Sequence, residues 1–254
     1  LLVLAGLGLS AAAIAGAPAR AVPIPWCGSG EPTADAPDAV DAFEWHVVYA
    51  TPSDGVDRFA SYAPRIAGDV AELSDWWVGR DQTRRPRFDL VASPGCGSEY
   101  GRVDISLVRT RPGTMSFEDV VADVNAAGFA SPDKSYLVYF DGAAQGSLCG
   151  ESTISSEVAA YAVVFLQSCN QASNDDLRAV IAAHEMTHGM GSVAALAPHY
   201  CPGSHVCDSS SDLMKPFFGQ NDSLAALTLD VGSDDYYGHS GTWPDVRDSS
   251  LLYR

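Results

Sequence analysis

Two histidines and one glutamate stand at a spacing that suits metal-dependent hydrolysis. His184 and His188 are four residues apart, and Glu185 directly follows the first of them. On an α-helix, side chains four apart project from one face, so both imidazoles can reach a single zinc ion. Glu185 lies off that axis, where its carboxylate can act as general base toward a water molecule that the metal activates. The pattern predicts a hydrolytic zinc site.

A catalytic zinc ion usually has three protein ligands and one water, so a third ligand is required. No glutamate follows Glu185 in the chain, which excludes a downstream glutamate ligand. Gly191 permits a sharp turn after the helix, and we expect the next histidine, His199, to return to the metal. The other candidates stay open: His205, His239 and the aspartates between positions 208 and 235, above all Asp235.

A helix has to hold the two histidines on one face. Segment 173–191 predicts that helix, since Ser173 or Asn174 can cap its start and Gly189 and Gly191 end it. Apolar runs predict strands at 44–50, 87–92, 103–108, 135–140 and 159–166, and helices at 57–78 and 116–127. This alternation of strands and helices favours an α/β (α+β) fold.

Longer stretches on both sides of the motif carry a family pattern. The runs are HEMTHGMGSVAALAPHY and CDSSSDLMKPF, with VVYATPSDGVDRF and TRRPRFDLVA upstream. Together they resemble secreted, actinobacterial-type, metzincin-like zinc metalloproteases, from about residue 43 to the end of the chain. The chain departs from the pattern in two respects: it lacks a cysteine after Met214 and another at Val231. Position 194, where metzincins place the third ligand, is Ala194, which cannot bind a metal.

The resemblance implies a metzincin-like zinc-peptidase fold with a twisted mixed sheet, an active-site helix and a loop-rich C-terminal subdomain. The catalytic domain would cover residues 44–254, with its two subdomains meeting after residue 191. One zinc ion would be held by His184, His188 and a displaced third histidine that matches His199. Met214 would lie in a tight Met-turn beneath the metal, as a packing residue rather than a ligand.

The N-terminal segment and the cysteines indicate an exported protein. Residues 1–21 are apolar as far as Pro18 and end in Ala-Arg-Ala, which predicts an N-terminally incomplete signal peptide; an extended lead-in follows over 22–43. Six cysteines without a C-x-x-C pair favour disulfides and a secreted location. The simplest pairing joins sequence neighbours: Cys27–Cys96, Cys149–Cys169 and Cys201–Cys207.

Charge narrows the class of partner. Lys and Arg number 15 against 32 Asp and Glu, which argues against binding to nucleic acid or to an anionic membrane. We therefore expect a secreted, monomeric zinc endopeptidase that acts on a protein or peptide substrate. Two other classes stay open: an exported binding module with a structural zinc, and a zinc amidase that hydrolyses cell-wall amide bonds. A Ca²⁺ ion at Asp230, Asp234 and Asp235 is a further alternative.

Overall fold

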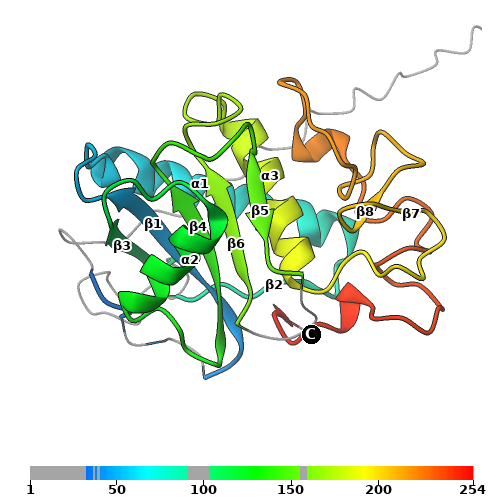
Figure 1. The fold of residues 1–254 in the computed structure, drawn as a ribbon. Helices are drawn as coiled ribbons and strands as arrows, with labels where there is room; N and C mark the ends of the chain where they lie inside the picture. The colour runs from blue at the N-terminus through cyan, green and yellow to red at the C-terminus, as the bar shows by residue number, and fades with distance from the viewer. Residues whose placement is uncertain (1–32, 37, 39–40, 91–102, 155–158, 254) are drawn as a thin grey trace, which may run out of the picture.

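The described part of the chain forms a five-stranded sheet with helices on both faces (Figure 1). In this computed structural model the described residues are 33–36, 38, 41–90, 103–154 and 159–253. The predicted signal peptide, Cys27, Cys96 and the bond predicted between them lie outside these ranges. No helix within them is both long and apolar enough to cross a membrane.

The sheet is mostly parallel, with strand order β3-β1-β4-β6-β5. Strands β1 (Glu44–Pro52), β3 (Ile105–Thr110), β4 (Lys134–Phe140) and β6 (Tyr161–Phe165) run parallel, and β5 (Gly150–Ser152) is antiparallel at one edge. The inner strands are buried on both faces, which explains why they read as continuous apolar runs in the sequence. The predicted α/β class with a mixed sheet is thus confirmed.

One predicted strand, 87–92, takes a different form. Phe88 and Leu90 make only isolated bridges, to Trp45 and Val103 respectively. Residues 91 and 92 lie outside the described ranges. Just upstream, the two-residue strand β2 (Arg85–Pro86) pairs antiparallel with β9 (Leu252–Tyr253), which ties the C-terminal region to the sheet domain.

Within the described ranges, three α-helices cover the sheet. α1 (Phe59–Arg80) and α3 (Asp175–Gly189) pack on one face, and α2 (Phe117–Ala126) packs on the other (Figure 1). The Ser116 hydroxyl accepts a hydrogen bond from the Asp119 backbone N–H at 3.2 Å, which confirms the predicted start of α2. The Asn174 side chain caps α3 in the same way, at 3.2 Å from the Leu177 N–H. Every residue of α3 from Leu177 onward is buried, so its side chains are held in one arrangement.

A buried ion pair joins the two helices on that face. The Arg178 guanidinium is fully buried and donates two hydrogen bonds to the Asp69 carboxylate of α1, at 2.6 and 2.7 Å. It donates a third bond to Asp175 at 2.8 Å. Because both charges of the first pair are removed from water, each depends on the other for its stabilisation.

Removing one partner of this pair is expected to be costly. In Asp69→Asn the buried guanidinium of Arg178 keeps its charge without a full counter-ion, so we expect a loss of about 3–5 kcal/mol in the free energy of unfolding. Urea denaturation measures it. Asp175→Asn is the matched control, because that carboxylate contacts the same arginine but is 52% exposed, and should cost less than about 1 kcal/mol. Equal losses of unfolding free energy in the two variants would contradict the assignment of Asp69 as the main counter-ion of Arg178.

The chain after α3 is mainly loops, as the sequence predicts. It contains the hairpin of β7 (Tyr200–Cys201) and β8 (His205–Val206), the 3-10 helices η2 (Leu224–Ala226) and η3 (Val246–Asp248), and β9. The predicted disulfides Cys149–Cys169 and Cys201–Cys207 are both formed. Buried carboxylates organise the loops: Asp230 accepts the backbone N–H groups of Tyr236 and Tyr237 at 2.8 and 2.6 Å.

Candidate metal centre

Helix α3 brings His184 and His188 together as the sequence predicts. Their ring centroids are 4.6 Å apart, and their two Nε2 atoms are 3.1 Å apart. Both side chains are at least nine-tenths buried. Because α3 is packed along its length, this separation is fixed by the helix and not by the side chains alone.

The third imidazole that lies with His184 and His188 is His205, whereas His199, the ligand expected from the sequence, lies in a separate group with Asp234 and Asp235. The ring of His205 lies 5.2 Å from that of His184 and 5.1 Å from that of His188. The three histidines form a group whose possible ligand atoms all lie within 4.8 Å of one another. His205 reaches this position because the β7–β8 hairpin, closed by Cys201–Cys207, folds back toward α3.

His199 is held elsewhere by Asp235. The fully buried Asp235 carboxylate accepts a hydrogen bond from the His199 backbone N–H at 2.8 Å, and its other oxygen is 3.0 Å from His199 Nδ1. This hydrogen bond, with the charge of Asp235, raises the pKa of His199. His199 therefore lies in a separate group with Asp234 and Asp235, and not with His184 and His188. Asp235, the second candidate ligand, is occupied by the same contact.

The other sequence candidates also stay apart from the three histidines. His239 stacks on Trp243, with ring centroids 4.7 Å apart. The proposed calcium ligands do not form a set either: Asp230 accepts backbone N–H groups, while Asp234 and Asp235 lie with His199.

Backbone carbonyls orient all three rings in the same manner. Nδ1 of His184 is 2.8 Å from the Leu213 carbonyl, Nδ1 of His188 is 3.2 Å from that of Ser192, and Nδ1 of His205 is 3.1 Å from that of Pro202. A carbonyl can only accept, so each Nδ1 carries the proton and each Nε2 has its lone pair free. This is how proteins usually fix the tautomer of a histidine that binds metal.

The two helix histidines are neutral at pH 7. Burial, and then the neighbouring His188, lower the pKa of His184 well below its usual value. Burial also lowers the pKa of His188, to about 4. Two unprotonated nitrogens 3.1 Å apart repel each other unless a cation lies between them. Nitrogens that bind one tetrahedral zinc ion at about 2.0–2.1 Å are themselves about 3.3 Å apart, so the residues fit this metal.

The segment that contains Met214 hydrogen-bonds both to His184 and to the strand that carries His205. The Leu213 carbonyl orients His184, and the Met214 carbonyl accepts the Val206 backbone N–H of β8 at 2.9 Å. Met214 itself is fully buried in the core. One short segment thus positions a ring of α3 and the strand that carries His205, and the methionine contributes packing.

Glu185 faces the edge strand β5. A Cβ atom placed on Gly150 would lie only 2.6 Å from Glu185 Oε1 and 2.7 Å from the methyl carbon Cγ2 of Ile181. Burial, followed by the charge of Glu151, raises the pKa of Glu185 well above its usual value. A carboxyl group with a raised pKa, on the residue that directly follows His184, is suited to accept and return a proton.

A second group of titratable side chains, which sequence analysis missed, surrounds the ammonium group of Lys134. Lys134 Nζ is 2.7 Å from carboxylate oxygens of Asp35, Asp38 and Asp89. The buried His46 bridges Asp89 and Ser106, at 2.6 and 3.0 Å. The ammonium group forms ion pairs with all three acids, and the cluster joins the lead-in residues to the start of β4. No sequence spacing connects these residues, so no local signal could have identified the group.

Comparisons with known proteins add little to this geometry. No protein-family model matches the chain, and no curated protein matches it. Among solved structures the chain is similar to wild-type OgpA from Akkermansia muciniphila, with 14% sequence identity and a TM-score of 0.35. That similarity covers 65% of this chain and 52% of the other, so the chain spans about half the length of that structure.

Proposed function

We propose that this protein is a secreted zinc metallopeptidase with a metzincin-like catalytic domain. The observation that carries the proposal is the grouping of His184, His188 and His205 within reach of one metal ion, with the buried Glu185 on the helix that carries the first two. Nitrogen ligands from three histidines suit zinc. The mostly parallel sheet with an antiparallel edge, the helix α3 and the loop-rich C-terminal region support a metzincin-like fold. The two disulfides support an extracellular location.

The residues divide the chemistry between them. His184, His188 and His205 would hold the metal. When bound, zinc supplies Lewis-acid polarisation of the substrate carbonyl and acidifies water. Glu185 takes the proton of the attacking water on its carboxylate and gives it to the amine nitrogen that leaves. Its burial keeps competing water away from that proton.

An open coordination position favours catalysis over a structural role. Within the described residues, the group at α3 contains three histidines and no fourth protein ligand. Structural zinc sites usually have four protein ligands, whereas catalytic sites keep one position for water or substrate. His205 is only half-buried, which leaves an approach from solvent on its side.

The edge strand β5 suits an extended peptide. Phe165 N–H bonds to the Cys149 carbonyl at 3.0 Å, and Thr153 N–H bonds to that of Tyr161 at 2.9 Å. Hydrogen-bonding direction alternates along a strand, so the backbone groups of Gly150 and Ser152 face away from β6. A peptide that pairs with this edge would pass directly beside Glu185.

Hydrolysis of an unfolded protein tests the proposal. We expect the mature protein to cleave casein, a zinc chelator to stop cleavage, and added zinc to restore it. Stoichiometric zinc binding without cleavage of casein or of peptides would overturn the peptidase assignment. Cleavage that persists after the metal has been removed would overturn the role of zinc.

A methyl group on β5 should impair turnover without loss of metal. In Gly150→Ala the new Cβ would contact the Glu185 carboxylate and Ile181 at less than 3 Å, so the flexible carboxylate must move. We expect kcat to fall by about 10²-fold, since small misplacements of a catalytic group carry costs of that size. Zinc content should be unchanged. Full activity in this variant would show that Glu185 is not confined by β5.

A further inference from the structure

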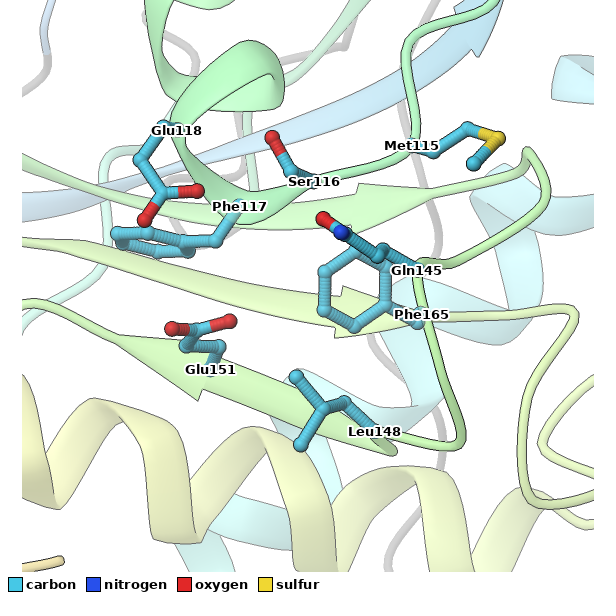
Figure 2. A pocket seen from close by; sticks show the side chains of 8 residues that line it. All are labelled: Met115, Ser116, Phe117, Glu118, Gln145, Leu148, Glu151 and Phe165. Carbon is cyan, nitrogen blue, oxygen red and sulfur yellow. The ribbon is translucent and has the colours of Figure 1, made fainter.

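A pocket lies on the opposite face of β5 from Glu185. It has a volume of about 190 Å³ and lies between the first turn of α2 and the β5–β6 edge of the sheet. Figure 2 shows side chains from these elements around one hollow. Its lining includes Met115, Phe117, Glu118, Leu148, Glu151 and Phe165.

The lining combines apolar surface with two carboxylates. Phe165 is buried beneath the pocket, while Met115 and Leu148 are large apolar side chains that remain 43% and 47% exposed. Neither Glu118 nor Glu151 forms an ion pair with any other described residue. Burial, and then the charge of Glu118, raise the pKa of Glu151, as expected for like charges without a counter-ion.

The pocket and the candidate metal centre are connected through consecutive residues of β5. Gly150 faces Glu185 on α3, and Glu151, one residue later, faces α2 and lines the pocket. Side chains alternate between the two faces of a strand. A peptide paired with β5 would alternate in the same way, with one side chain toward the metal centre and its neighbour toward the pocket.

We propose that this pocket binds the lysine or arginine side chain of a substrate residue adjacent to the one that pairs opposite Gly150. The proposal rests on the proposed peptidase function and names its specificity. The aliphatic part of the side chain would pack on Phe117 and Leu148, and its cationic group would lie between Glu118 and Glu151. A basic side chain satisfies both properties of the lining, whereas an acidic one would be repelled and a purely apolar one would leave the carboxylates unpaired.

Matched peptides test this specificity. In one set of quenched fluorogenic peptides, a single lysine is placed at each position of the same parent sequence in turn. In a second set, norleucine replaces that lysine. We expect kcat/KM to favour lysine by about tenfold or more at one position. Glu118→Gln and Glu151→Gln should each reduce this preference, and the double variant should abolish it. Asp133 is an exposed acid just before β4, so Asp133→Asn is the control and should retain the preference.

A binding measurement separates this proposal from the peptidase assignment. Fluorescence anisotropy of the same peptides is measured on Glu185→Ala, with and without the two glutamine substitutions. If no peptide is cleaved but lysine peptides bind more tightly and lose this advantage in the double variant, the pocket stands and the peptidase assignment fails. Equal treatment of lysine and norleucine in both assays overturns the pocket. A lysine preference that survives the double variant overturns it as well.

Discussion

Replacing Glu185 with glutamine is expected to reduce peptide hydrolysis by at least about 10³-fold while zinc remains bound. The glutamine side chain has the same shape and fills the same space against Gly150, but it cannot accept the proton of the attacking water. The three histidines keep their carbonyl partners, so metal affinity should not change. Hydrolysis of casein and zinc content by atomic absorption are measured on the same preparation.

A matched substitution away from α3 completes this experiment. Asp133→Asn removes an exposed carboxylate just before β4 that belongs neither to the candidate metal centre nor to the β5 pocket, so hydrolysis should persist. If Glu185→Gln retains wild-type turnover with zinc present, the proposed role of Glu185 as base is wrong. If the variant loses zinc as well, the loss of turnover says nothing about proton transfer and Glu185 contributes to the stability of the site instead.

His205→Ala is expected to weaken zinc binding by at least about 100-fold, whereas His199→Ala should leave the affinity unchanged. The first variant removes one of the three nitrogens that would bind the metal. Loss of a residue that only hydrogen-bonds to a metal ligand lowers metal affinity by roughly 10–100-fold, and loss of a ligand should lower it further. The second variant removes an imidazole that is hydrogen-bonded to Asp235 and lies apart from His184 and His188. Competition with a chromophoric zinc chelator gives both affinities.

The two histidines control for each other, because both lie in the loop region that follows Gly191. The reverse result, with zinc lost in His199→Ala and kept in His205→Ala, would restore the assignment made from the sequence. Loss in both would mean that the Asp235 contact and the β7–β8 hairpin are equally required to shape the site.

The sheet and the three helices could be predicted because their signals are local. The buried strands β1, β4 and β6 are continuous apolar runs, and α3 has a capping residue, a first turn of acids and a glycine end. β5 was missed because it has three residues, one of them Gly150, and no alternation to recognise. Its position is set by pairing with β6 and not by its own sequence.

The third histidine could not be predicted because its position is set by tertiary contacts. The spacing of His184 and His188 follows from helical geometry alone, so the sequence was sufficient for them. The positions of His199 and His205 depend on the loops that contain them. His199 is hydrogen-bonded to the buried Asp235, whereas the β7–β8 hairpin places His205 beside His184 and His188. The short Cys201–Cys207 separation was the one clue that His205 lies on a closed, ordered turn.

That disulfide has a consequence for how the metal centre would mature. Cys201 and Cys207 are six residues apart and flank His205, so the bond restricts the hairpin that carries the third ring. The conformational entropy of the hairpin is then lost when the cysteines are oxidised, and not when the metal binds, because the His205 imidazole is already in position. Maturation would accordingly have an order, with oxidation before metal uptake. In a reducing compartment the same chain would offer zinc two fixed nitrogens and a third on a less constrained loop, which would make premature loading of the site unfavourable.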